Sequence, residues 1–249
     1  STAYTYFTLK RVLEVADILK KKFDKRLAKI KEYSEGAAKA YQELVTKKSF
    51  SLDTDRQAKL VRPLYMGILN PKQEEFAKNR LLKAMDNYGW RLGTGFLSTP
   101  FILNVLAKLD IEYAYKLLEN EKCPGWLFMV KNNATTIWES WEGNLTSDKG
   151  VASLNHYSKG AVCEWLMNTM CGINIDGENK FIISPLPGGS ITFAKASYNS
   201  IYGQVECSWE RKDKSISYVI KIPSNTMATI ILPSGKKENV LTGTYIFSE

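Results

Sequence analysis

The hydrophobic positions of roughly the first 172 residues recur at helical spacing. In the opening stretch they lie three or four residues apart, at Leu9, Val12, Leu13, Ala16 and Leu19. The same spacing continues at Leu27, Ile30, Ala37, Tyr41 and Leu44, and again at Ala58, Val61, Leu64, Tyr65 and Ile68. Each such helix has one apolar face, so the pattern predicts paired amphipathic helices.

Residue types at the ends of these segments predict the helix boundaries. The pair Asn70-Pro71 is typical of a helix cap and first turn, and Pro100 opens an apolar run through Leu109. Asp110 is a suitable cap for the helix after that run. We expect a last helix over about residues 157–170 and a stop at Gly172.

The hydrophobic period changes to two in the final third of the chain. Polar and apolar residues alternate over residues 204–209, and turn signals such as Pro187-Gly188-Gly189 separate short stretches rich in Ile, Val, Thr and Tyr. This pattern predicts an antiparallel β-sandwich. We therefore expect a mainly α protein with a β domain, divided into residues 1–175 and 176–249. The number of helices alone would suggest only a bundle or a helical repeat.

Composition excludes several classes of protein. The 249 residues carry a net charge of +8, but the lysines are spread along predicted helices and no nucleic-acid-binding motif accompanies them. The cysteines lack C-x-x-C spacing, so we expect four buried free thiols and neither a zinc site nor a redox centre. No apolar run is long enough to span a membrane. We expect neither a nucleic-acid partner nor a membrane partner.

Residues 134–143 carry the clearest chemical signal. They interleave the carboxylates of Glu139 and Glu142 with the indoles of Trp138 and Trp141, and the only histidine, His156, follows. Indoles offer flat faces on which a sugar ring can stack, and a carboxylate beside them can take a proton from water. The combination indicates carbohydrate chemistry.

Several further motifs make this indication specific. Residues 94–100 (TGFLSTP), 124–129 (PGWLFM), 134–143 (ATTIWESWEG) and 152–157 (ASLNHY) occur in one order and are similar to signatures of the bacterial alpha-L-rhamnosidases. The resemblance runs nearly from end to end of the chain. It implies part of an (α/α)6 barrel, a ring of six helical hairpins, followed by a small antiparallel β-sandwich.

Members of this family are much longer chains, and their general acid lies in a segment that would precede Ser1. The resemblance therefore implies a fragment that lacks the general acid and depends on the missing N-terminal portion of its parent. Apolar helix faces that the rest of the ring would cover are then exposed, so we expect poor solubility or self-association of the isolated fragment.

The resemblance also assigns catalytic roles. The family inverts the configuration at the anomeric carbon of the sugar. This reaction requires a general acid and a general base whose carboxyl groups lie roughly 6.5 to 9.5 Å apart. Glu139 matches the general base within the pattern Thr-Ile-Trp-Glu. Glu142, three residues further on, we interpret as a supporting residue that helps hold the loop. A helical turn would bring the two carboxylates closer than inversion requires, so we do not expect them to form the acid–base pair.

Other residues match positions that contact the sugar. His156 matches the histidine by which the family recognises rhamnose, and we assign its neighbour Asn155 to the same role. Trp138, Trp141, Trp126 and Phe96 are candidates to stack on the sugar or to wall its pocket, with packing as the simpler reading. An apolar patch from Phe96, Trp126 or Met129 would favour the C6 methyl group of rhamnose. The chemistry requires no cofactor and no metal.

Two other functions remain open. Another glycosidase or a lyase on the same helical ring would act on uronides only with a basic residue facing the substrate carboxylate, and none lies within residues 135–143. A non-catalytic carbohydrate-binding module would use Glu139 only to hydrogen-bond hydroxyls. The substrate expected from the resemblance is a rhamnose-containing glycoside or oligosaccharide.

Overall fold

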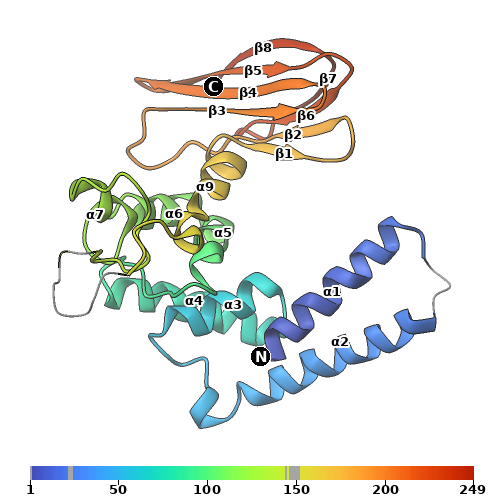
Figure 1. The fold of residues 1–249 in the computed structure, drawn as a ribbon, viewed down its shortest axis with the longest axis vertical. Coiled ribbons are helices and arrows are strands. Elements are labelled where there is room, and N and C mark those ends of the chain that lie inside the picture. Colours follow the sequence, from blue (N-terminus) through green and yellow to red (C-terminus); the bar gives the residue numbers. More distant parts are fainter. Residues whose placement is uncertain (1, 22–24, 144, 146–151) are drawn as a thin grey trace.

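The computed structural model describes residues 2–21, 25–143, 145 and 152–249, and places a helical part beneath a β part (Figure 1). The longer helices are α1 (Thr2–Ile18), α2 (Lys25–Leu44), α3 (Gln57–Met66), α4 (Pro71–Asn87), α5 (Thr99–Leu109), α6 (Ile111–Leu118) and α7 (Trp126–Lys131). The short helical segments are η1 (Lys48–Phe50), α8 (Tyr157–Gly160), α9 (Val162–Trp165) and the π-helical turn η3 (Leu166–Met170). Among the described residues, none of the helices combines the length and apolar character needed to traverse a bilayer.

The longer helices form successive hairpins, α1–α2, α3–α4 and α5–α6. Helix α1 lies against α3, α3 lies against α5, and α5 continues the row to α8 and α9. Aromatic rings join the row, since Tyr65 of α3 stacks on Phe101 of α5 at 4.1 Å between ring centroids and Phe7 of α1 lies 6.2 Å from Tyr65. One helix of each hairpin thus lies in a shared layer, as in an arc of a hairpin ring.

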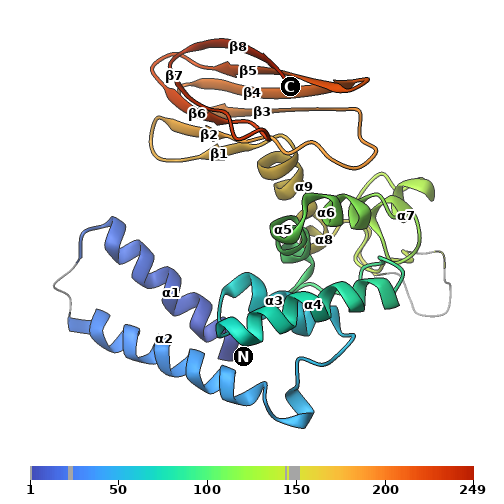
Figure 2. The same ribbon diagram turned by 180° about the vertical axis from the view of Figure 1, so that it is seen from behind.

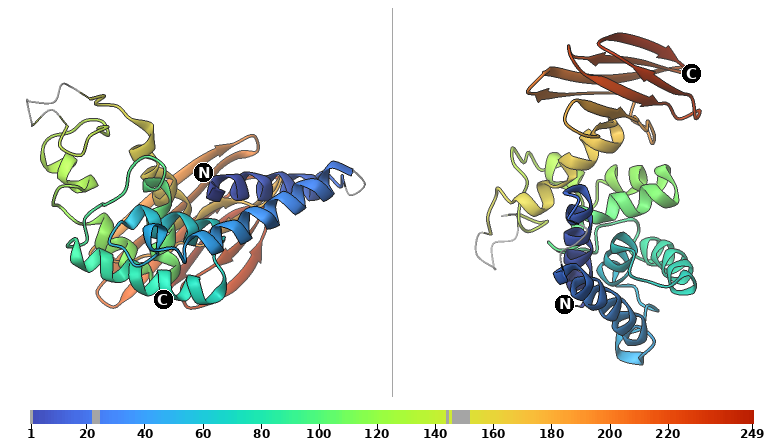
Figure 3. Two further views of the ribbon diagram at one scale, coloured as in Figure 1. Left: turned by 90° about the horizontal axis from the view of Figure 1, so that it is seen from below. Right: turned by 90° about the vertical axis from the view of Figure 1, so that its right-hand side faces the viewer.

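The α1–α2 hairpin projects away from the remainder of the molecule (Figures 2 and 3). Its apolar side chains are exposed toward the tip: Val15 is 53% exposed, Ile18 77% and Leu19 60%. Among the described residues no apolar layer covers these side chains, and they form the uncovered surface that the sequence predicts.

The predicted helix boundaries are largely confirmed. The side chain of Asn70 accepts a hydrogen bond from the backbone N–H of Gln73 at 3.0 Å, and the Gln73 side chain accepts one from the Asn70 backbone N–H. Asp110 likewise accepts from the Glu112 backbone N–H at 2.9 Å and caps α6. These bonds satisfy amide groups that the first helical turn leaves without partners.

The prediction of one continuous helix over residues 157–170 is wrong, because α8, α9 and η3 divide that segment. The indole N–H of Trp126 donates to the backbone carbonyl of Lys159 at 3.0 Å. That carbonyl is therefore engaged by a side chain from α7 at the point where the helix is interrupted. A contact from a distant part of the sequence changes the local structure here.

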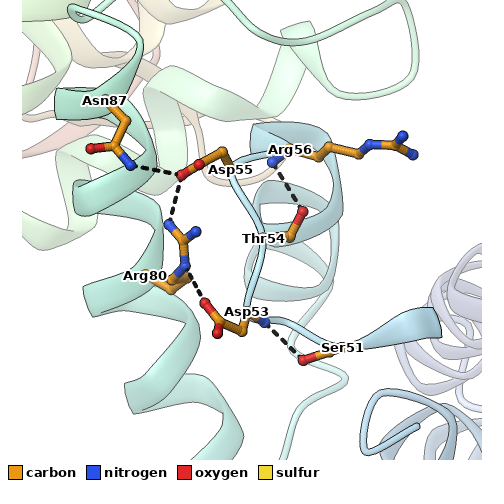
Figure 4. Close-up of polar contacts among 7 residues, drawn as sticks. All are labelled: Ser51, Asp53, Thr54, Asp55, Arg56, Arg80 and Asn87. Atoms are coloured by element: carbon orange, nitrogen blue, oxygen red, sulfur yellow. Dashed lines mark hydrogen bonds and ion pairs between the residues drawn. The ribbon is translucent and has the colours of Figure 1, made fainter. Parts of the chain in front are cut away.

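The loop between η1 and α3 is fastened to α4 by a polar network (Figure 4). The Arg80 guanidinium of α4 bonds Asp53 at 2.7 Å and Asp55 at 2.9 Å, and Asn87 donates to the same Asp55 oxygen at 3.0 Å. Hydrogen bonds from Arg80 and Asn87 hold the pKa of the Asp55 carboxyl below its usual value. The network sets the path of the chain from η1 to α3.

The β part contains two four-stranded sheets within the described residues, in the orders β1-β2-β6-β7 and β3-β4-β5-β8. The strands are β1 (Ile173–Ile175), β2 (Lys180–Ile183), β3 (Phe193–Ser200), β4 (Gly203–Lys212), β5 (Ser215–Ile222), β6 (Met227–Ile231), β7 (Lys237–Val240) and β8 (Gly243–Ser248). The predicted alternation in β4 is confirmed, since Val205, Cys207 and Trp209 are buried. Their side chains share one core with those of the other sheet.

One strand pair departs from the expected antiparallel arrangement. Strands β2 and β6 run parallel, with Phe181 opposite Ala228 and Ile183 opposite Ile230. Parallel neighbours need a long crossover connection, and the chain supplies it by building β3, β4 and β5 in the other sheet before β6. The turn spacing in the sequence does not reveal this crossover.

The β part is closely joined to the helices. The indole N–H of Trp209 donates to the Met170 carbonyl at 2.9 Å, and the Tyr115 hydroxyl donates to the Leu186 carbonyl at 2.7 Å. The Glu119 carboxylate of α6 accepts from the Ser190 backbone N–H at 2.9 Å. Helix gives way to strand between Met170 and Ile173, so β1 precedes the division expected near residue 175.

The cysteines are all free thiols, as expected. The expectation that all four are buried is wrong, since Cys163 is exposed and Cys123 is only partly buried. Cys171 and Cys207 lie in the core, and burial raises the pKa of the Cys171 thiol to about 11. Cys163 belongs to the short helix α9, whose buried side chains are those of Val162 and Trp165.

Candidate active site

The Glu139 loop, defined here as residues 134–143, connects α7 toward α8 without regular secondary structure. It ends in a tight turn in which the Gly143 N–H donates to the Ser140 carbonyl at 3.2 Å and the Ser140 hydroxyl donates to the Gly143 carbonyl at 3.1 Å. Gly143 has φ +60, and a β-carbon there would lie 2.3 Å from the Trp138 ring. Only glycine fits both requirements without strain.

A second segment, residues 152–156, runs beside this loop and fixes Glu139. The Glu139 N–H donates to the Ser153 carbonyl at 2.8 Å, and the Ser153 N–H donates to Oε2 of the Glu139 carboxylate at 3.0 Å. The His156 N–H donates to the Ile137 carbonyl at 2.8 Å. These bonds bring Glu139 and His156 into one site, with Glu139 half-buried and one of its carboxylate oxygens held by backbone.

His156 stands at the start of α8, as the sequence predicts, and its ring lies between two other aromatic rings. The ring of Phe96 stacks on it at 4.5 Å between centroids, and that of Tyr157 at 5.3 Å. The Nδ1 atom of His156 is buried and has no hydrogen-bond partner in the part of the chain that the structure describes. Stacking therefore orients the ring while hydrogen-bonding capacity at this nitrogen stays unused.

The indoles near Glu139 are packed rather than open. Trp126, Trp138 and Trp141 are 4%, 6% and 8% exposed. Trp126 and Trp141 meet edge to face at 6.0 Å between ring centroids. They wall the Glu139 loop, and they present little free surface for stacking on a sugar.

Phe96 differs from the indoles, because it is 44% exposed beside His156. Of the three side chains considered for an apolar patch, Trp126 and Met129 are buried and only Phe96 has an open ring. Asn155 is also exposed, and its backbone N–H donates to the Ser153 hydroxyl at 3.2 Å. The predicted residues thus divide into a buried wall and an exposed face at His156.

Glu142 lies at the edge of the site and is exposed. Its carboxylate accepts a hydrogen bond from the Cys123 thiol at 3.6 Å. Burial raises the pKa of that thiol to about 11, and the negative charge of Glu142 adds to the effect. Glu142 therefore connects the end of the Glu139 loop to the chain just before α7.

Lys159 is a site residue that sequence reasoning missed. Its side chain is buried, its ammonium donates a hydrogen bond to the backbone carbonyl of Glu139, and the ammonium nitrogen lies 3.9 Å from the Trp141 ring centroid. Burial lowers the pKa of Lys159 to about 8, although the carboxylates of Glu142 and Glu139 oppose this effect. The signal available in the sequence was its helical spacing of three from His156, which places both at the same helix start.

Lys159 also bears on the uronide alternative, which needs a basic residue beyond residues 135–143. Its ammonium does reach the Glu139 loop, but it is buried and already engaged by the Glu139 carbonyl and the Trp141 ring. A substrate carboxylate would have to compete with these two partners for the ammonium.

Among the described residues, no group of three or more His, Cys, Asp or Glu side chains is placed to hold a metal ion.

Comparison with known proteins assigns the two parts of the chain to one family of enzymes. The family model described as the bacterial alpha-L-rhamnosidase 6 hairpin glycosidase domain matches residues 1–170, which form the helical part of this chain. The family model of the bacterial alpha-L-rhamnosidase C-terminal domain matches residues 175–246. The chain belongs to the bacterial alpha-L-rhamnosidase family. The expected fold, part of an (α/α)6 barrel followed by a β domain, is confirmed.

Individual relatives support this assignment. An alpha-L-rhamnosidase of Formosa agariphila is 33% identical over 247 residues, which are 96% of this chain and 26% of the relative. The structure of the Streptomyces avermitilis alpha-L-rhamnosidase complexed with L-rhamnose matches with a TM-score of 0.87 and 27% identity, over 100% of this chain and 26% of that one. The Aspergillus terreus alpha-L-rhamnosidase matches with a TM-score of 0.88 and 25% identity, over 99% and 30%. The chain therefore spans between a quarter and a third of the length of these relatives.

Proposed function

We propose that the protein containing this chain is an inverting glycoside hydrolase that releases terminal alpha-L-rhamnose from rhamnosides. This longer protein is called the parent protein below. The observation that carries the proposal is the fixed carboxylate of Glu139, held through Oε2 by the Ser153 N–H in a loop whose backbone also pairs with His156 through the Ile137 carbonyl. The substrate class follows from the rhamnosidase relatives and from the neighbour solved with L-rhamnose.

In this proposal Glu139 is the general base. Its second carboxylate oxygen accepts a proton from water, the water oxygen attacks the anomeric carbon, and the aglycone leaves with the bonding electron pair. A carboxylic acid in the part of the parent protein that lies outside this chain protonates the leaving oxygen. The helices up to Met170 contribute the later hairpins of the ring, and the strands from Ile173 onward form the sandwich joined to them.

The remaining site residues take binding and supporting roles. His156 and Asn155 hydrogen-bond the sugar hydroxyls, for which the partial exposure of His156 and the exposure of Asn155 provide support. Phe96 offers its open ring to the C6 methyl group. Trp126, Trp138 and Trp141 wall the pocket, and Glu142 holds the end of the Glu139 loop.

The test uses the parent protein and an aryl alpha-L-rhamnoside. Glu139→Gln should lower kcat by about 10²- to 10⁴-fold, the usual contribution of general base catalysis, while rhamnose binding is retained. His156→Ala should raise KM as well as lower kcat, because it removes a substrate contact. Glu121→Gln is the matched control, since Glu121 is an exposed carboxylate paired with Lys131 outside the site.

Two further readouts decide the mechanism. Proton NMR of the wild-type reaction should detect the inverted anomer first, and retention would overturn the mechanism. Glu139→Ala with added azide should give the rhamnosyl azide of inverted configuration, because azide needs no base to attack the anomeric carbon. A parent protein that binds rhamnose without turnover would instead be a carbohydrate-binding module.

A further inference from the structure

The burial of Lys159 calls for a physical reason. A lysine is almost never fully buried unless its charge is compensated, and Lys159 is 3% exposed. Its ammonium is compensated by the Glu139 backbone carbonyl and by the face of the Trp141 indole, 3.9 Å from the ring centroid. Both partners belong to the Glu139 loop, so the cation is a direct link from α8 to the residue proposed as the base.

The backbone of Lys159 is fixed as well as its side chain. Its carbonyl accepts the Trp126 indole N–H of α7 at 3.0 Å, and Trp126 packs edge to face on Trp141. The Lys159 backbone, from which the ammonium side chain extends, is therefore held in a fixed position. A rigid anchor bonded to the main chain of Glu139 restricts where the Glu139 carboxylate can lie.

In the part of the chain that the structure describes, three titratable groups act on the ammonium. Glu139 and Glu142 face it from the Glu139 loop, and Cys123 faces it from the chain before α7. Beyond Cys123, the Arg91 guanidinium donates to the Cys123 carbonyl at 3.3 Å. Lys159 is thus a buried cation that two carboxylates stabilise electrostatically, and removal of its proton would take this attraction away from both.

We propose that Lys159 is a positioning residue for the hydrolytic reaction, and that its protonated ammonium holds the Glu139 loop in the conformation in which Glu139 activates water. The inference rests on the proposed function, because it assigns a role relative to Glu139 as the base. It adds a requirement that the base assignment alone does not contain: the loop loses its catalytic geometry when Lys159 loses its proton.

The direction of the pH effect follows from the burial of this group. Burial lowers the pKa of Lys159 to about 8, so the ammonium is charged below that pH and is lost as pH rises through it. Activity should therefore fall as the pH rises through about 8, and this fall is called the alkaline limb of the pH profile below. With ordinary rhamnosides, deprotonation of the general acid would give a limb of its own and would obscure this one.

Alpha-L-rhamnosyl fluoride removes that ambiguity, because fluoride leaves with the bonding electrons and needs no acid to protonate it. The base still takes the proton from the attacking water. In the parent protein we expect the kcat for the fluoride to fall above about pH 8. Lys159→Met should lower that kcat by about 10- to 100-fold with little change in KM, the effect of a displacement of about 1 Å in a catalytic group, and the alkaline limb should disappear.

Two variants keep the test decisive. Lys159→Arg retains a cation that does not lose its proton in this range, so it should recover much of the activity and shift the limb to higher pH. If Lys159→Met does not fold, the profile of Lys159→Arg against that of the wild type decides. Lys116→Met is the matched control, because Lys116 lies over the Trp90 ring at 4.2 Å on α6, outside the site, and its removal should leave kcat and the limb unchanged.

The outcomes separate the two proposals. An inactive Glu139→Gln together with wild-type kinetics and an unchanged alkaline limb in Lys159→Met would overturn the role of Lys159 alone. An active Glu139→Gln would overturn the base assignment and with it the inference. A limb that remains at the same pH in Lys159→Arg would also overturn the inference, since another group would then be titrating.

Discussion

Gly143 offers a direct test of how the Glu139 loop is held. A β-carbon at Gly143 would lie 2.3 Å from Cε3 and 2.7 Å from Cζ3 of the Trp138 ring, and the residue has φ +60. A left-handed conformation costs an alanine about 1–2 kcal/mol, and forcing atoms into a packed site costs about 1–3 kcal/mol. Gly143→Ala should therefore destabilise the closed loop by about 2–5 kcal/mol in total.

Native-state hydrogen exchange of the parent protein measures this cost locally. The amides of Glu139 and His156 report on the loop, because they are bonded to the carbonyls of Ser153 and Ile137 at 2.8 Å each. Each 1.4 kcal/mol corresponds to about tenfold in an opening equilibrium, so exchange of both amides should accelerate by at least about 30-fold in Gly143→Ala. The two amides should accelerate together, since one loop opening exposes both.

A matched glycine separates the two costs. Gly67 has φ +64, but a β-carbon at Gly67 would meet no atom within 4 Å, so Gly67→Ala should show only the backbone cost at the neighbouring Ile68 amide. In a Trp138→Ala background, which removes the whole indole ring, the added cost of Gly143→Ala should fall to the same level. If Gly143→Ala costs no more than Gly67→Ala, the indole does not hold the turn and the argument is refuted.

Two further predictions concern the connections that support the site. Arg80→Ala should lower the midpoint of thermal unfolding by about 2–4 °C, because the substitution releases the loop network of Figure 4 from α4. Lys78→Ala removes only an exposed ion pair with Glu74 and should change the midpoint by less; equal effects of the two substitutions would contradict the role of the network. Glu119→Gln should accelerate hydrogen exchange of the Ser190 amide by about tenfold, because a charge-assisted hydrogen bond becomes a neutral one; unchanged exchange would show that the α6 carboxylate does not hold this turn.

The sequence predicts the parts of the fold that depend on local chemistry. Hydrophobic spacing locates the helices, and Asn70 and Asp110 cap them as expected because capping uses residues three or fewer positions away. The alternation in β4 predicts its buried face for the same reason. The resemblance to known motifs adds Glu139 and His156, which the structure brings together through the pairing of their two segments.

The features that the sequence does not reveal depend on contacts between distant segments. The helix over residues 157–170 is interrupted where the Trp126 indole bonds the Lys159 carbonyl, and no local pattern records that bond. The parallel pairing of β2 with β6 depends on a crossover through the other sheet. The tryptophans beside Glu139 are suited by composition to sugar stacking, yet packing against one another buries them.

The same distinction explains why the proposed base is recognisable while its support is not. Glu139 lies in a loop without helix or strand, so its own residues contribute few of the bonds that fix it. Its position depends on Ser153 on one side, on the Lys159 ammonium on another, and on the turn at Gly143 packed against Trp138. Each of these contacts restricts the position of Glu139, so loss of any one of them leaves that position less well fixed. Perturbing Lys159 or Gly143 should therefore reduce turnover while Glu139 itself is intact, a behaviour expected of a loop held from outside and not of a carboxylate on a rigid helix.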